Sequence, residues 1–207
     1  MDACRTRLID GITALCLSVN TDQTAQLLHF ICLIEKWNKA YNLTAIKNKQ
    51  DMVKLHLLDS LTVLPYLSGT QIIDVGTGAG LPGIPLAICL PHIKFTLLDS
   101  NAKKTRFVQQ VVLELKLTNV QICHSRAERF KSVSLFDTVI SRAFADLADI
   151  VQTTRHLLAD DGILLAMKGH CANEEFLNIT ADKQIIPVRV PGVDAERNLV
   201  LLKFNKK

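Results

Sequence analysis

The sequence has few aromatic residues and none of the cysteine spacings or long apolar runs that mark several other protein classes. Aromatic side chains make up 5% of its 207 residues, so a core must be built mainly from aliphatic side chains. The six cysteines form no Cys-x-x-Cys pair, and no run of His and Cys has zinc-ligand spacing. The chain shows no signal peptide and no apolar run of about 18 residues. These absences predict a cytoplasmic protein with reduced thiols, no metal and no membrane segment.

The composition that is present fits one globular domain with a sizeable core. Hydrophobic residues make up 48% of the chain and charged residues 21%, and the formal net charge of +4 permits an anionic partner without requiring one. The basic residues gather in four short clusters: Lys36 and Lys39; Lys47, Lys49 and Lys54; Lys103, Lys104 and Arg106; Arg126, Arg129 and Lys131. One such cluster is most simply a solvated surface, whereas several around one cleft would favour nucleic acid.

The first 67 residues have the periodicity of amphipathic helices. Apolar residues recur at helical spacing from Leu27 to Tyr41, after a candidate cap at Thr21 and Asp22. A second amphipathic stretch covers residues 50–66, with Asn48 as its candidate cap. We therefore expect residues 1–67 to form a helical extension that packs on a core domain of residues 68–207.

From residue 68 onward, short apolar runs alternate with helical segments. The expected strands cover residues 71–75, 94–98, 120–123, 136–141, 163–168, 185–190 and 198–204. The expected helices cover residues 86–90, 103–117 and 147–158, with a weaker one at 173–178. This alternation predicts an α/β fold with a mainly parallel seven-stranded sheet and helices on both faces. Ligands of such sheets bind beyond the carboxyl ends of the strands.

A glycine-rich turn follows the first expected strand. Gly76, Gly78 and Gly80 permit a tight turn and close approach of a ligand to the backbone. A nicotinamide fingerprint would need its third glycine three places after the second, where this chain has Leu81. Asp74 can anchor the turn and attract a cationic ligand. S-adenosylmethionine carries an ammonium and a sulfonium and lacks phosphate, so the turn favours it over a dinucleotide.

Two further strand ends carry candidate cofactor residues. Asp99 can accept two hydrogen bonds from ribose hydroxyls, and it could also cap the helix that begins near Asn101. Ala127 and Glu128 follow the third strand, where a backbone amide and a small side chain suit the adenine ring. The alternative for that loop is a surface turn with a local ion pair.

The acceptor side is expected at the ends of the fourth and fifth strands. Arg142 could orient an acceptor base or phosphate through its planar guanidinium, or it could pair with Asp99, Asp137 or Asp146. Lys168 and Gly169 would line the same side. We interpret His56, Asp59 and Ser60 as part of a packed or solvated helix, although a role in the site stays open.

Taken together, these motifs resemble the bacterial family of 16S ribosomal RNA guanine-N7 methyltransferases, also called glucose-inhibited division protein B. The similarity spans nearly the whole chain. The matching segments are Lys36–Thr44, His56 with Leu58-Asp59-Ser60, Asp74 with Gly76–Pro85, Leu97–Ser100, Arg126–Glu128, Ser141–Ala145 and Met167–Gly169. One departure is Ala79, where many relatives carry proline; alanine should keep the turn.

The resemblance implies a Rossmann-like class I methyltransferase that uses S-adenosylmethionine to methylate N7 of a guanine near the decoding centre of 16S ribosomal RNA. It implies cofactor contacts at Gly76, Leu81, Ala127, Glu128 and Arg142, to which the residue patterns add Gly78 and Asp99. Guanine N7 has no proton to lose, so we expect Arg142 to act by orientation, without a general base.

The expected partner is 16S ribosomal RNA or the small-subunit particle, and we expect a monomer. The alternatives are a methyltransferase of another substrate, an RNA-binding assembly factor with the same fold, and an NAD-dependent oxidoreductase.

Overall fold

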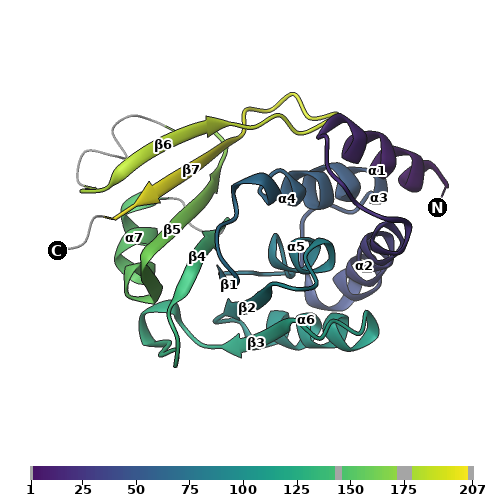
Figure 1. The fold of residues 1–207 in the computed structure, drawn as a ribbon. Helices are drawn as coiled ribbons and strands as arrows, with labels where there is room; N and C mark the ends of the chain where they lie inside the picture. The colour runs from purple at the N-terminus through teal and green to yellow at the C-terminus, as the bar shows by residue number, and fades with distance from the viewer. Residues whose placement is uncertain (1, 143–145, 172–178, 205–207) are drawn as a thin grey trace.

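The computed structural model describes residues 2–142, 146–171 and 179–204 (Figure 1). Helices dominate the first third of the chain. They are α1 (Asp2–Ala14), α2 (Thr21–Tyr41), α3 (Lys49–Met52), a π-helix η1 (Val53–Leu58), α4 (Asp59–Leu61) and a 3-10 turn η2 (Leu64–Tyr66). The later helices are α5 (Gly83–Cys89), α6 (Ala102–Glu114), η3 (Ala127–Arg129), α7 (Leu147–Thr154) and η4 (Arg155–Leu157).

Seven strands form one sheet in the order β3-β2-β1-β4-β5-β7-β6. Their bounds are β1 (Gln71–Val75), β2 (Lys94–Asp99), β3 (Val120–His124), β4 (Phe136–Ser141), β5 (Leu158–Lys168), β6 (Asp182–Pro187) and β7 (Asn198–Lys203). The pairs among β1 to β5 are parallel, and β7 runs antiparallel to both β5 and β6. This confirms the predicted mainly parallel sheet. The strand order reverses between β1 and β4, which is where such sheets bind ligands.

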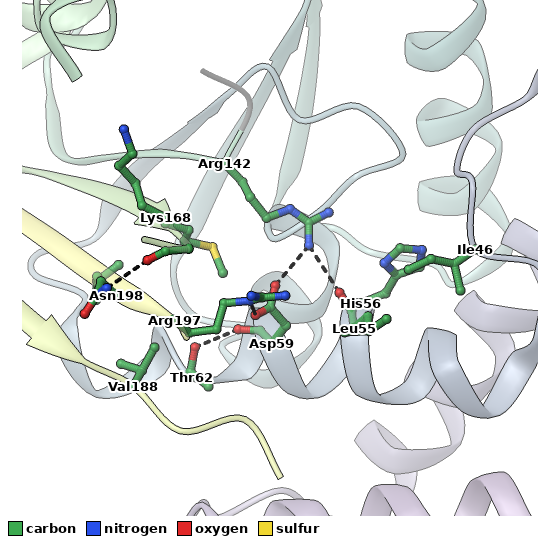
Figure 2. Close-up of a pocket in the computed structure, with 13 residues that line it drawn as sticks. Ile46, Leu55, His56, Asp59, Thr62, Arg142, Lys168, Val188, Arg197 and Asn198 are labelled. Carbon is green, nitrogen blue, oxygen red and sulfur yellow. Dashed lines mark hydrogen bonds and ion pairs between the residues drawn. The ribbon is translucent and has the colours of Figure 1, made fainter. Parts of the chain in front are cut away.

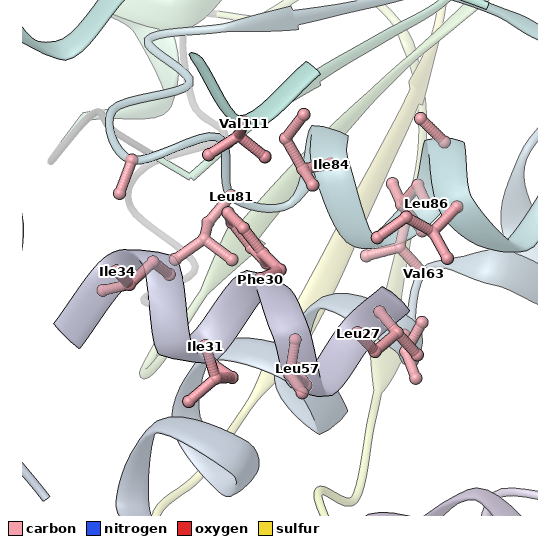
Figure 3. Close-up of a cluster of buried hydrophobic side chains, with 14 of the residues drawn as sticks. Leu27, Phe30, Ile31, Ile34, Leu57, Val63, Leu81, Ile84, Leu86 and Val111 are labelled. Atoms are coloured by element: carbon pink, nitrogen blue, oxygen red, sulfur yellow. The ribbon is translucent and has the colours of Figure 1, made fainter. Parts of the chain in front are cut away.

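Alternate residues of the strands face two separate hydrophobic layers. Ile72 of β1 packs with the N-terminal helices, α5 and α6, whereas the next residue, Ile73, packs with α7. Figure 3 shows Phe30 of α2 among side chains of η1 and α5, and Phe30 is fully buried. Close packing extends to α1, where a Cβ on Gly11 would lie 2.3 Å from Cδ1 of Leu58. The N-terminal helices therefore share one core with the sheet; the division at residue 67 stays a prediction.

Two details of the N-terminal helices differ from the sequence expectations. Asn20, and not Thr21 or Asp22, caps α2, because its side chain accepts from the Gln23 backbone amide while the Gln23 side chain accepts from the amide of Asn20. Asn48 caps α3 as expected. The predicted helix over residues 50–66 is interrupted by the π-helix η1 and ends at Leu61, so its periodicity is not that of one regular helix.

The second half of the sheet differs at β5 and β6. The helix predicted over 147–158 ends at Thr154, and β5 begins at Leu158. The pairing of β5 with β4 has a register shift, and in this part of β5 Leu158 is buried while Asp160 and Asp161 are exposed. Gly162 permits the backbones of β4 and β5 to approach closely here, since a Cβ at position 162 would lie 2.8 Å from the Phe136 carbonyl oxygen. Strand β6 lies three residues earlier than expected. The weak helix predicted at 173–178 lies outside the described residues.

Candidate active site

The glycine-rich turn is anchored by a buried carboxylate. Oδ2 of Asp74 accepts a hydrogen bond from the Thr77 hydroxyl at 2.7 Å and another from the Gly83 amide at 2.8 Å. Gly76 and Gly78 have φ angles of 73° and 59°, a region that L side chains rarely adopt. Burial raises the pKa of Asp74 to about 6, although these two hydrogen bonds act in the opposite direction. Asp74 thus anchors the turn as expected, but it is fully buried and does not line the adjoining cavity.

Asp99 ties the turn to the second strand. One carboxylate oxygen accepts from the Gly78 amide and the other from the Asn101 amide, both at 2.8 Å. Each oxygen keeps a lone pair for a further donor, such as a ribose hydroxyl. The helix-capping alternative for Asp99 is wrong: Asn101 caps α6 by accepting from the amides of Lys103 and Lys104.

A cavity of ≈ 280 Å³ adjoins this turn, and we name it the glycine-turn cavity. Four of the predicted cofactor residues line it together: Gly76, Asp99, Ala127 and Glu128. The last two stand on the 3-10 turn η3 after β3. Leu81 lies elsewhere: it is 3% exposed, packs in the hydrophobic core, and donates its amide to the Thr77 carbonyl at 2.9 Å.

Arg142 lines a second cavity of ≈ 370 Å³, which we name the arginine cavity (Figure 2). Its walls come from the ends of β4 and β5, the start of β7, and the segment from Leu55 to Thr62. Nη1 of Arg142 lies 3.3 Å from Oδ2 of Asp59 and 3.5 Å from the Leu55 carbonyl oxygen. Among the described residues Arg142 therefore pairs with Asp59, and not with the three aspartates considered from the sequence.

The carboxylate of Asp59 holds a second arginine. Nε of Arg197 donates to Oδ1 of Asp59 at 3.1 Å, and Nη1 of Arg197 donates to the Glu196 carbonyl at 2.9 Å. Lys168 also lines this cavity, as predicted, and Asn198 holds the Gly169 carbonyl at 2.8 Å. The described lining therefore carries three cationic side chains and one carboxylate, a charge balance that suits an anionic ligand.

His56 forms a buried part of the same wall. It is 5% exposed, and its Nε2 lies 3.0 Å from the Thr44 hydroxyl oxygen. Asn38 fixes Thr44 in turn, donating to its carbonyl and accepting from its amide, each at 2.9 Å. Burial, and secondarily the charge of Arg142, lowers the pKa of His56 from 6.5 to about 4, so the ring is neutral at pH 7.

The sequence interpretation therefore missed part of the site. Asp59 and His56 are buried, as a packed helix requires, but both line the arginine cavity. Arg197 was not singled out at all. One signal was available for Asp59: a carboxylate among Leu57, Leu58 and Leu61 on a buried helical segment needs a charged partner.

The strand order, the glycine-rich turn and the position of Asp99 define a Rossmann-like class I S-adenosylmethionine-dependent methyltransferase fold. Solved structures with this fold include TYW2 from M. jannaschii in complex with AdoMet, which is 15% identical, has a TM-score of 0.56, and aligns over 73% of this chain and 76% of its own. The putative methyltransferase yhhF from Escherichia coli is 17% identical, with a TM-score of 0.55 over 73% and 87% of the two chains.

A family model described as rRNA small subunit methyltransferase G (GidB) matches residues 23–200. The ribosomal RNA small subunit methyltransferase G of Chromobacterium violaceum is 48% identical over 93% of this chain and 94% of its own length. The protein of the same name from Pseudomonas aeruginosa is 46% identical over 95% and 94%. The chain belongs to the rRNA small subunit methyltransferase G family, which confirms the resemblance seen in the sequence.

None of the helices in the described residues combines the length and apolarity needed to cross a membrane. Nor do three or more of the His, Cys, Asp and Glu side chains in these residues gather in an arrangement that could hold a metal ion.

Proposed function

We propose that this protein transfers a methyl group from S-adenosylmethionine to N7 of a guanine in 16S ribosomal RNA, near the decoding centre. The observation that carries the proposal is the pairing of two different cavities at one edge of the sheet. The glycine-turn cavity follows β1, β2 and β3, and the arginine cavity follows β4 and β5. Strands β1 and β4 are neighbours, so a donor and an acceptor bound there would meet at the point where strand order reverses.

The residues around the glycine-rich turn fit S-adenosylmethionine, which supplies an electrophilic methyl group on a sulfonium. Asp99 would accept from the ribose hydroxyls through the lone pairs that its two backbone hydrogen bonds leave free. Gly76 and Gly78 would let the ligand approach the backbone, and Ala127 and Glu128 would flank the adenine. Leu81 would contribute indirectly, because its side chain packs in the hydrophobic core next to the glycine-rich turn.

The acceptor nitrogen requires no proton transfer. Guanine N7 has an in-plane lone pair and no hydrogen, so alignment and exclusion of water can supply catalysis. His56 fits this view, because its ring is buried and its Nε2 is engaged by Thr44. Arg142 would orient the acceptor nucleotide, and it would also approach the cofactor as the family resemblance implies.

The positive lining of the arginine cavity supports an RNA substrate. Arg142, Arg197 and Lys168 can meet phosphate oxygens, and a guanine in a loop is splayed out more readily than a paired one. Lys104 and Arg126, from two of the basic clusters, line the glycine-turn cavity. Lys49 and Lys54, in contrast, pair with Glu35 and Asp51 on the surface. The proposed partner is 16S ribosomal RNA or the small-subunit particle, acted on in the cytoplasm by a metal-free monomer.

Methyl transfer from tritiated S-adenosylmethionine tests the proposal directly. The substrates are naked 16S ribosomal RNA and 30S particles from a strain that lacks this enzyme, followed by digestion and identification of the labelled nucleoside. Label in 7-methylguanosine is the expected result. Label in another molecule would favour a methyltransferase of a different substrate, and cofactor binding without label in any RNA would favour an assembly factor.

A further inference from the structure

A single carboxylate organises the arginine cavity. The side chain of Asp59 is 7% exposed and receives one guanidinium on each oxygen, Arg142 at 3.3 Å and Arg197 at 3.1 Å. Figure 2 shows the two arginines reaching Asp59 from different parts of the fold. Arg142 follows β4, Arg197 precedes β7, and Asp59 begins α4, so three segments that are far apart in the sequence meet at this carboxylate.

The fold alone does not require such a cluster. A buried ion pair contributes little net stability, because desolvation of the charges offsets their attraction, and apolar side chains of similar size often serve as well. The arginine side chains are not themselves buried: they are 28% and 27% exposed and face the cavity. Two neighbouring guanidinium groups repel each other, and the carboxylate between them offsets that repulsion.

The arginines keep donors that Asp59 does not use. In the contacts of the described residues, Arg142 donates through Nη1, and Arg197 donates through Nε and Nη1. Within the described part of the chain, Nε and Nη2 of Arg142 and Nη2 of Arg197 therefore have no protein acceptor and can donate to a ligand in the cavity. Guanidinium N–H groups held in a fixed orientation bind phosphate oxygens well, because little side-chain entropy is lost when the ligand arrives.

We propose that Asp59 is a positioning residue, which holds Arg142 and Arg197 as a fixed pair that receives a phosphate of the substrate RNA. The inference rests on the proposed function and adds a role for a residue that acts through the two arginines it holds. The backbone of η1 (Val53–Leu58) contributes to the same arrangement, because the Leu55 carbonyl accepts from the Arg142 nitrogen that Asp59 also holds.

The substitution Asp59→Asn tests this role, with Asp51→Asn as a matched control. Asp51 lies on the same helical segment and also forms an ion pair, with Lys54 at 2.9 Å, but it is 47% exposed and outside the arginine cavity. RNA binding is measured at several salt concentrations, methyl transfer by steady-state kinetics, and cofactor binding by calorimetry. We expect Asp59→Asn to lower kcat/KM at least tenfold and leave the Kd for S-adenosylmethionine within twofold, and the control to match the wild type.

The salt dependence separates positioning from simple charge balance. If Asp59 positions the arginines, its loss lets them separate, and the slope of log K against log salt becomes shallower by about one phosphate contact. If Asp59 is only a negative charge near the RNA, its removal tightens RNA binding and steepens the slope, which would overturn the inference. Weaker cofactor binding with unchanged RNA binding would overturn it too, since the anion received would then be the carboxylate of S-adenosylmethionine.

A second variant covers the case in which Asp59→Asn does not fold. Asp59→Glu keeps the charge and moves the carboxylate by one methylene, so a positioning role predicts a lower kcat/KM at unchanged net charge. Full activity of a folded Asp59→Glu protein would refute the role. Absence of methyl transfer by the wild type would count against the proposed function instead, so the two failures are distinguishable.

Discussion

Two buried groups next to the candidate site predict opposite responses of stability to acid. The pKa of His56 is lowered from 6.5 to about 4, mainly by burial, and that of Asp74 is raised from 3.8 to about 6, also mainly by burial. Below pH 6.5 the unfolded chain protonates His56 while the folded protein does not, so acid costs stability. Below pH 6 the folded protein protonates Asp74 while the unfolded chain does not, so acid adds stability.

These shifts give magnitudes for the interval from pH 7 to pH 5. Linkage assigns to His56 a loss of about 2 kcal/mol and to Asp74 a gain of about 1 kcal/mol. The two contributions cancel in part in the wild type and leave a net loss of about 1 kcal/mol. Substituting either residue should therefore expose the other. His56→Gln keeps a polar group near Nε2 for Thr44, and Asp74→Asn keeps one oxygen for the two donors that now share Oδ2.

Urea unfolding of the wild type and both variants at pH 7 and pH 5 measures these terms. Relative to the wild type, His56→Gln should gain about 2 kcal/mol on going to pH 5, and Asp74→Asn should lose about 1 kcal/mol. The comparison with wild type removes the contribution of every other titrating group. A difference between variant and wild type that stays constant with pH, for either residue, would refute the argument that burial displaces its pKa.

Three substitutions test other parts of the site. Arg142→Ala should lower methyl transfer to ribosomal RNA at least a hundredfold; unchanged cofactor binding and unchanged turnover would contradict an orienting role. Asp99→Ala should weaken S-adenosylmethionine binding, measured by calorimetry, by about 2 kcal/mol, because the ribose and the Gly78 amide both lose an acceptor. An unchanged Kd would exclude the ribose contact. Gly83→Ala should lower the free energy of unfolding, measured in urea, by about 1–3 kcal/mol, since the added Cβ would lie 2.1 Å from Cδ2 of Leu97. Wild-type stability of this variant would show that the surrounding side chains rearrange without cost.

The strands and the glycine-turn cavity could be predicted because both depend on local patterns. Apolar runs that end at a glycine or an aspartate mark the carboxyl ends of β1 and β2, and parallel strands place those ends at one edge of a sheet. The fold class alone therefore predicts that Gly76 and Asp99 lie close together, and both line the glycine-turn cavity. Leu81 shows the limit of this reasoning, because its side chain packs in the core below the turn.

The arginine cavity could be predicted only in part, because its partners are set by packing between distant segments. The strand-end rule located Arg142 and Lys168, but the pairing of Asp59 with two arginines depends on how η1 and α4 lie against β4 and β7. The irregular segment adds to the difficulty. Six residues in π conformation change which side chains share a face, so the 3.6-residue period misassigns residues beyond it.

The N-terminal helices therefore contribute polar contacts to the candidate site as well as apolar packing. Asn38 fixes Thr44, Thr44 holds His56, and Asp59 on the following turn holds Arg142. Among the described residues, Asp59 is the side chain that contacts both arginines. The N-terminal helices thus provide the carboxylate that both arginines contact. The hydrophobic core holds this carboxylate in place, because its neighbours Leu57, Leu58 and Leu61 are each no more than 1% exposed. We therefore expect substitutions in this buried helical face to disturb the arginine cavity, where we propose that the acceptor binds, more than the glycine-turn cavity.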